Sequence, residues 1–282
     1  MKDTLTPAEA SSAERTAVRE VQYAQKRYHQ QENPKAVLLA GQPGAGKTML
    51  SSLILPRLGN DAVLINGDDY RRYHPDYKSL YEKYGSDSVA MTSAFSGTVT
   101  EILIERLSNL KYNLVIEGTG RTVEVPKGTA ERLTAKGFAV EMAVIATRPL
   151  LSLISTVQRF YQMNERGTIP RATAIEAHDN VVSALPSNLD TLSECPYISK
   201  IMIWTRDAKL YYDSENDSSW PSAKLKHIWN KKWLASELAD ARSKIELLRA
   251  MEEKTSLGQG YVIDEIQRRF RREISRSREQ SR

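Results

Sequence analysis

The stretch Gly41-Gln42-Pro43-Gly44-Ala45-Gly46-Lys47-Thr48 follows an apolar run at residues 36–40 and precedes a segment of helical character. It matches G-x-x-x-x-G-K-[S/T], the pattern of a phosphate-binding loop, at every fixed position. Glycines let backbone N–H groups surround a polyphosphate, the lysine reaches the outer phosphates, and the threonine hydroxyl reaches Mg²⁺. The following helix adds the positive end of its dipole. We therefore expect a nucleoside-triphosphate-binding α/β domain with Thr48 as the metal ligand.

The composition of the chain indicates its cellular compartment. The chain has 282 residues and one cysteine, Cys195, so no internal disulfide can form and a reducing compartment is expected. The first residues lack the apolar core of a signal peptide, and no apolar run approaches the length of a membrane span. The four histidines show no metal-ligand spacing. These observations predict a cytoplasmic protein without a membrane segment.

The net charge of +5 lies at one end of the chain. Residues 267–282 contain seven arginines and two glutamates, so this segment carries the whole excess. Surfaces for single-stranded nucleic acid usually interleave aromatic side chains with basic ones, and this segment has only Phe270. We interpret it as a solvated or partner-binding helix, which argues against a nucleic-acid partner.

Short apolar segments alternate with helical patterns along most of the chain, which predicts a parallel sheet flanked by helices. A helix is expected within residues 7–32 before the first strand, and a helical pattern resumes after a polar linker at residues 213–222. We predict a P-loop kinase-like domain over residues 1–215, with an N-terminal helix in residues 1–33, and a helical, basic C-terminal extension over residues 216–282. The predicted strands are residues 36–40, 62–65, 113–117, 140–146 and 201–204, and the predicted helices include residues 87–110, 171–184 and 224–253.

Carboxylates follow two of these strands at the edge where open α/β sheets bind ligands. Asp68 and Asp69 follow the second strand, and either could be the base that a kinase needs. Because successive residues at a strand end point in opposite directions, only one of the two should face the site, and we favour Asp68. Residues 117–121, Glu-Gly-Thr-Gly-Arg, follow the third strand and offer groups suited to a sugar or nucleotide acceptor.

Arg159 and Arg171 flank a break that contains Gly167 and Pro170, and we expect them to stabilise the transferred phosphoryl group from a lid.

Several of these pieces together resemble the zeta toxin family of bacterial toxin–antitoxin systems. The resemblance covers roughly residues 30–215 in order and spacing. Its motifs are residues 41–48, the strand-end acid before His74-Pro75, residues 112–121, Val125-Pro126 with Thr129, residues 135–138, residues 171–173, and Ala177-His178-Asp179 running to Leu185-Pro186.

The resemblance implies an ATP- and Mg²⁺-dependent kinase that phosphorylates the 3′-hydroxyl of the aminosugar in UDP-N-acetylglucosamine and so blocks peptidoglycan synthesis. Carried over by position, it makes Lys47, Asp68, Arg159 and Arg171 the catalytic residues. It also implies a small helical antitoxin that covers the nucleotide site, and we expect this inhibitor to act in trans. The implied contacts to the UDP-sugar are Glu101, Glu117, Thr119, Arg121 and Thr129.

Two other functions stay open. The chain could phosphorylate a different nucleotide, such as another UDP-sugar or NAD, since the fold and the base would be unchanged. It could instead be a regulatory nucleotide-binding protein whose basic C-terminal helix, residues 264–282, binds nucleic acid or a partner in a salt-sensitive way. The sequence does not determine the oligomeric state.

Overall fold

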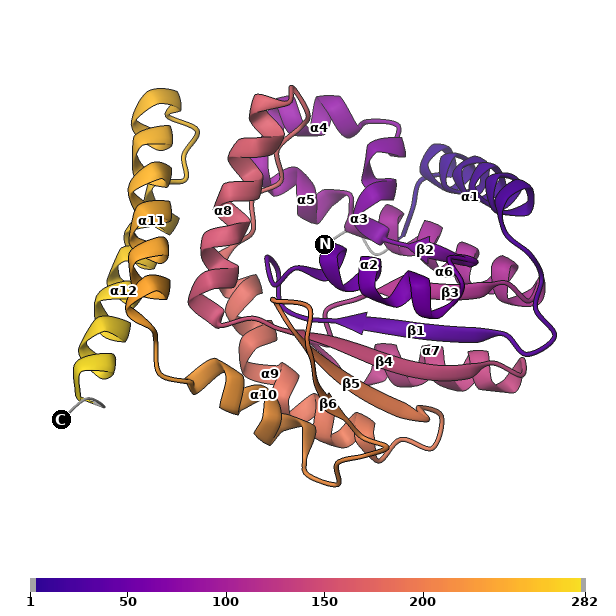
Figure 1. Cartoon of the computed structure of the whole chain (residues 1–282). Coiled ribbons are helices and arrows are strands. Elements are labelled where there is room, and N and C mark those ends of the chain that lie inside the picture. Colours follow the sequence, from indigo (N-terminus) through magenta and orange to yellow (C-terminus); the bar gives the residue numbers. More distant parts are fainter. Residues whose placement is uncertain (1–3, 280–282) are drawn as a thin grey trace.

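The computed structural model describes residues 4–279 and is built around one six-stranded sheet with the order β2-β3-β1-β4-β5-β6 (Figure 1). The first five strands are parallel, and β6 pairs antiparallel with β5 as the second arm of a hairpin. All five predicted strands are confirmed, and the fold is the expected P-loop kinase-like α/β class. The strands are β1 (Lys35–Ala40), β2 (Ala62–Ile65), β3 (Asn113–Glu117), β4 (Ala139–Ala146), β5 (Lys200–Thr205) and β6 (Leu210–Asp213).

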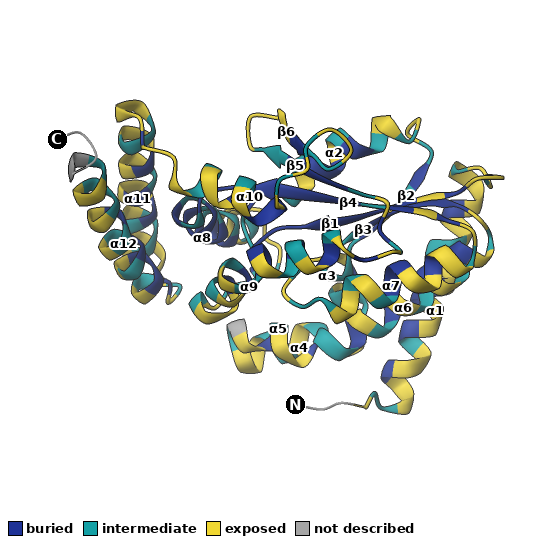
Figure 2. Ribbon diagram, turned by 90° about the horizontal axis from the view of Figure 1, so that it is seen from below, coloured by how far each residue is buried: buried dark blue, intermediate teal, exposed yellow. Residues whose placement is uncertain are grey.

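Helices cover both faces of the sheet (Figure 2). In β1, Val37 and Leu39 face the cluster around α2 (Lys47–Arg57), whereas Ala36, Leu38 and Ala40 face the opposite cluster. A strand buried on both faces is almost wholly apolar, which explains the unbroken run at residues 36–40. The helices on that opposite face are α1 (Pro7–Arg27), α6 (Ser93–Asn109), α7 (Glu124–Ala135), α9 (Ile175–Ser193) and α10 (Pro221–Asn230).

The remaining helices frame one edge of the sheet and the C-terminal end of the chain. They are α3 (Gly67–Tyr70), the 3₁₀ turns at Arg71–Tyr73 and Gly85–Asp87, α4 (Tyr77–Tyr84), α5 (Ser88–Met91), α8 (Pro149–Glu165), α11 (Ala235–Thr255) and α12 (Gly260–Glu279). Because β1 to β4 run parallel, the loops after them all emerge at the same edge, where α3 and α8 also lie.

Several predicted helix boundaries were wrong. The single helix expected over residues 87–110 breaks at Thr92 into α5 and α6, and the one expected over 224–253 breaks at residues 231–234 into α10 and α11. The helix expected to begin at Arg171 begins at Ile175, since residues 171–174 form no regular secondary structure, and it continues beyond Pro186 to Ser193. Tertiary packing overrides local propensity at such ends, because buried partners offset the lost hydrogen bonds.

The C-terminal helices divide between two cores. Leu225 of α10 belongs to the core beneath the sheet, whereas Ile245 of α11 and Ile266 and Phe270 of α12 form a separate apolar cluster with α8. The boundary predicted at residue 216 stays a prediction.

Within residues 267–279, several arginines of the basic segment form intrachain ion pairs, among them Arg269 with Asp179 and Arg276 with Glu273. Residues 280–282 of that segment lie outside the described residues.

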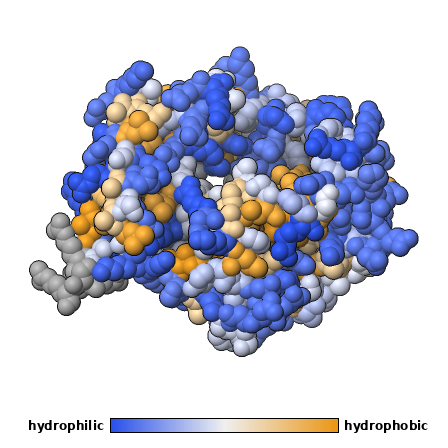
Figure 3. All heavy atoms as spheres, in the orientation of Figure 1, coloured by the Kyte–Doolittle hydropathy of each residue, from blue (hydrophilic) through white to orange (hydrophobic). Residues whose placement is uncertain are grey.

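The surface is largely polar. In Figure 3, hydrophilic side chains cover most of the visible face, and apolar groups form separate small patches. None of the helices between residues 4 and 279 has both the length and the apolar character that a membrane crossing requires.

Candidate active site

The phosphate loop is pressed against α8. Gly44 has a φ of +75°, and a Cβ atom there would lie 2.0 Å from the carbonyl oxygen of Ser152. Only glycine fits this position, because any side chain would collide with the backbone of α8. Helix α2 begins directly at Lys47, so its N-terminal end, which is the positive end of the helix dipole, faces the loop. The local structure is that of an anion-binding loop.

Lys47 follows the last glycine of the loop and begins α2. Its Nζ donates to the carbonyl oxygen of Gly41 at 3.1 Å and lies 3.8 Å from Oε1 of Glu117, with only 12% of the side chain exposed. Burial lowers the pKa of Lys47, and the Glu117 carboxylate opposes that shift. Burial likewise raises the pKa of Glu117, against the charge of Lys47. Each charge therefore stabilises the other at the end of β3.

Asp68 lies on α3 and not at a strand end. Asn66 caps this helix, and Asp68 and Asp69 both fall in its first turn, so the argument from alternating strand directions does not apply to them. The Asp68 carboxylate accepts a hydrogen bond from Nε of Arg71 at 2.9 Å. Arg71 is held in turn by the carbonyl oxygen of Val89 and the hydroxyl of Thr92. Arg71 is not among the site residues predicted from the sequence, although its i+3 spacing from Asp68 was a usable signal.

Three arginines control the charge of Asp68. Burial alone would raise the pKa of its carboxyl group, but Arg171, Arg71 and Arg159 outweigh burial and hold the pKa below its usual value. Asp68 is therefore ionised at neutral pH. Among the three, only Arg71 donates to the carboxylate; Arg171 donates through Nη1 to the backbone carbonyl oxygen of Asp68 at 2.5 Å.

Arg159 lies on α8, whereas Arg171 lies in the segment of residues 166–174 that joins α8 to α9, and both lie beside Asp68. The Nε atoms of both are buried without a hydrogen-bond partner among the described residues. Burial lowers the pKa of Arg159, and Asp68 and Glu117 offset part of that effect. Buried guanidinium groups with unused donors fit a site that binds an anion.

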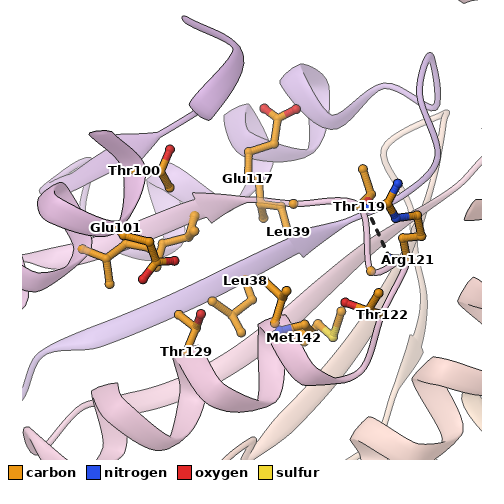
Figure 4. Close-up of a pocket in the computed structure, with 16 residues that line it drawn as sticks. Leu38, Leu39, Thr100, Glu101, Glu117, Thr119, Arg121, Thr122, Thr129 and Met142 are labelled. Atoms are coloured by element: carbon orange, nitrogen blue, oxygen red, sulfur yellow. Dashed lines mark hydrogen bonds between the residues drawn. The ribbon is translucent and has the colours of Figure 1, made fainter. Parts of the chain in front are cut away.

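All five residues proposed as acceptor contacts line one cavity of about 310 Å³ next to the phosphate loop. Figure 4 shows Thr129 of α7 and Met142 of β4 on one side, with Thr119 and Arg121 at the loop after β3. The Glu117 carboxylate points away from Thr129, which agrees with its approach to Lys47. Glu117 therefore lies at the border between the cavity and the phosphate loop.

The other acceptor candidates differ in their surroundings. Thr129 is 5% exposed, whereas Glu101 forms a half-exposed ion pair with Arg132 at the cavity rim. The loop after β3 is fixed by Asn188 of α9, whose side chain donates to the carbonyl oxygens of Gly120 and Arg121. Asn188 is not among the site residues predicted from the sequence, and neither are Thr100 and Thr122, two further residues that line the cavity. They carry no motif of their own, and only the fold brings them together.

The donor set fits Mg²⁺ bound with phosphates. Thr48 is exposed in the first turn of α2, and the carboxylates of Asp68 and Glu117 belong to the same edge of the sheet. Mg²⁺ prefers such oxygen ligands and usually combines one or two protein groups with substrate phosphates and water. Within residues 4–279, no group of three His, Cys, Asp or Glu side chains forms a separate metal cluster.

A phosphate loop, a carboxylate and several buried cations, all at one edge of a parallel sheet, define the chain as a P-loop phosphotransferase of the kinase type. Comparisons with known proteins agree. The zeta toxin family model matches residues 19–217. Toxin PezT of Streptococcus pneumoniae is 41% identical over 205 residues, which is 72% of this chain and 80% of that protein. Toxin zeta of Streptococcus pyogenes is 39% identical over 217 residues, 76% of each chain. The chain belongs to the zeta toxin family.

Solved structures show the same fold. A structure from the PezAT chromosomal toxin–antitoxin system of Streptococcus pneumoniae superposes with a TM-score of 0.77 at 33% identity, over 88% of this chain and 98% of that one. The AvrRxo1-ORF1:-ORF2 complex with ATP has a TM-score of 0.57 at 15% identity, over 93% of this chain and 86% of that one. The second likeness concerns the fold alone.

Proposed function

We propose that this toxin transfers the γ-phosphoryl group of ATP to the 3′-hydroxyl of the aminosugar in UDP-N-acetylglucosamine, and that the product blocks peptidoglycan synthesis. The observation that carries the proposal is the clustering of Lys47, Asp68, Arg159 and Arg171 around Glu117, which also lines the acceptor cavity. These are the parts that phosphoryl transfer requires, namely cations for the phosphates and a base for the acceptor hydroxyl.

Each residue has a role in this proposal. The backbone of residues 41–48 and Lys47 hold the phosphates, and Thr48 would hold Mg²⁺, which would neutralise phosphate charge. Asp68, kept ionised by its arginines, accepts the proton of the attacking hydroxyl. Arg159 and Arg171 stabilise the charge on the transferred group. The cavity lined by Glu117, Thr119, Arg121, Thr129 and Glu101 orients the UDP-sugar.

The same proposal includes a partner and a location. The pneumococcal neighbour comes from a toxin–antitoxin system, and we propose that a small helical antitoxin inhibits this chain by covering its nucleotide site. ATP, a UDP-sugar and the single buried thiol Cys195 all suit a cytoplasmic enzyme.

Mass spectrometry of purified protein with Mg·ATP and a panel of acceptors tests the proposal directly. We expect UDP-N-acetylglucosamine to gain one phosphate, with no gain in the Asp68→Asn variant. Phosphorylation of only another UDP-sugar or of NAD would contradict the proposed acceptor but not the proposed kinase activity. If no acceptor gains a phosphate although ATP binds normally, the proposed kinase activity itself is contradicted.

A further inference from the structure

A continuous line of hydrogen-bonded side chains connects the C-terminal helix with the phosphate loop. Arg269 of α12 donates through Nη1 and Nη2 to the two carboxylate oxygens of Asp179 at 2.7 and 2.6 Å. The Oδ1 atom of Asp179 lies 3.0 Å from Nδ1 of His178, whose Nε2 lies 2.8 Å from Oγ of Ser152. Gln42 of the phosphate loop completes the line, with Nε2 donating to the same Oγ at 3.2 Å.

The charge of Asp179 determines which atom donates and which accepts in each of these hydrogen bonds. A carboxylate only accepts, so Asp179 holds the proton of His178 on Nδ1 and leaves Nε2 as an acceptor for the hydroxyl of Ser152. Burial lowers the pKa of His178 more than the neighbouring Asp179 raises it, and the ring is therefore neutral. The oxygen of Ser152 then accepts from Gln42, whose amide nitrogen also donates to the carbonyl oxygen of Thr147 at 2.6 Å. The Ser152 Oγ also lies 2.9 Å from the carbonyl oxygen of Pro149, so its one hydrogen is shared between that oxygen and Nε2 of His178.

Ser152, His178 and Asp179 have the connectivity of a nucleophilic triad, but the surroundings exclude that chemistry. Ser152, His178 and Gln42 are each fully buried, at 0% exposure, so no substrate reaches the hydroxyl. Among the described residues, Oε1 of Gln42 has no hydrogen-bond partner, whereas Nε2 of the same amide makes two hydrogen bonds. The hydrogen bonds that are formed hold one arrangement of the chain in place. The role that remains for this line is to position the elements it joins.

Those elements are the ones that bind the nucleotide in the proposed function. Ser152 lies on α8, which also carries Arg159, and its carbonyl oxygen is the atom that excludes a side chain at Gly44. His178 lies on α9, seven residues after Arg171. A second contact reinforces the loop, since the hydroxyl of Thr147 donates to the carbonyl oxygen of Ala45 at 2.6 Å.

We propose that Asp179, His178 and Ser152 are positioning residues that hold the phosphate loop through Gln42, and that α12 contributes to nucleotide affinity at a distance through Arg269. This inference rests on the proposed nucleotide-binding function. It assigns the C-terminal helix a task that requires neither nucleic acid nor a partner protein.

The test measures equilibrium binding of Mg·ADP, which does not turn over, by isothermal titration calorimetry on the full chain. Arg269→Met removes the outer end of the line, Arg269→Lys keeps its charge, and Ser152→Ala interrupts its centre. Arg272→Met is the matched control, because Arg272 lies on the same helix without a recorded hydrogen bond to any residue of the described part. Thermal unfolding of each variant shows that binding is measured on folded protein.

We expect Arg269→Met and Ser152→Ala each to weaken Mg·ADP binding about tenfold. Arg269→Lys should recover part of the loss, and Arg272→Met should bind like the wild type. The Arg269→Met/Ser152→Ala double variant should lose less than the sum of the two single effects, because both changes interrupt one line. Wild-type affinity in folded Arg269→Met, or fully additive losses, would overturn the inference alone. Absence of Mg·ADP binding in the wild type would overturn the proposed function together with this inference.

Discussion

The backbone carbonyl oxygen of Asp68 accepts a hydrogen bond from Nη1 of Arg171 at 2.5 Å, between residues 103 positions apart in the chain. Arg171 thereby fixes α3 from the opposite side of the site and leaves the Asp68 carboxylate to Arg71. Its positive charge still contributes to the low pKa of that carboxyl group. One guanidinium group therefore positions the expected base and also keeps it ionised.

Asp68→Asn should lower kcat by about 10²–10⁴-fold, the usual contribution of a general base. The affinity for ATP should stay close to that of the wild type, because the phosphates are held by the loop and its lysine. Single-turnover phosphate transfer measures the first quantity and calorimetry the second. Asp69→Asn is the matched control on the same helical turn. The opposite pattern, with turnover retained in Asp68→Asn and lost in Asp69→Asn, would move the base to Asp69.

Arg71→Met should shift the acid limb of the kcat–pH profile to higher pH. The Arg71 guanidinium helps to keep the pKa of Asp68 below its usual value, so its removal raises that pKa, and the base becomes protonated at a higher pH. Arg72→Met serves as the control, because Arg72 stacks on Tyr73 instead of contacting Asp68. An unchanged acid limb in Arg71→Met would show that another group controls the profile.

Arg159→Met should raise the melting temperature of the free protein while lowering kcat by about 10²–10³-fold. Burial lowers the pKa of Arg159, which means that the folded protein disfavours its charge, and a neutral side chain removes this cost. Differential scanning calorimetry and steady-state kinetics give the two quantities. Arg166→Met, at the exposed end of α8, should change neither. A lower melting temperature in Arg159→Met would contradict the assignment of a destabilising buried charge.

Thr129→Val should raise the KM for the UDP-sugar about tenfold and leave the KM for ATP unchanged, because a buried hydroxyl in the acceptor cavity is replaced by a methyl group. Initial-rate kinetics with each substrate varied in turn measure both constants. Thr134→Val is a control on the same helix, since Thr134 is exposed and lies outside the residues that line the cavity. A rise in the KM for ATP would place the nucleotide in this cavity instead.

Local sequence determined much of this protein. The apolar runs predicted the five parallel strands, because a strand buried on both faces leaves a continuous hydrophobic signature. The phosphate loop was evident because its glycines, Lys47 and Thr48 occupy fixed positions within eight residues. Strand ends also indicated where Glu117 and the following loop would lie, because parallel strands place their carboxyl ends on one edge.

Only the tertiary structure decided how distant side chains meet. The contact from Arg171 to Asp68 and the hydrogen bonds that hold Arg71 against Val89 and Thr92 depend on packing between segments that are not adjacent in the sequence. The same is true of the line from Arg269 to Gln42, whose members belong to three helices and a loop. Periodicity and spacing report short-range geometry, whereas a hydrogen bond across a core depends on the placement of whole elements. The phosphate loop was therefore determined by its own eight residues, and its fixed position against α8 was determined by the fold.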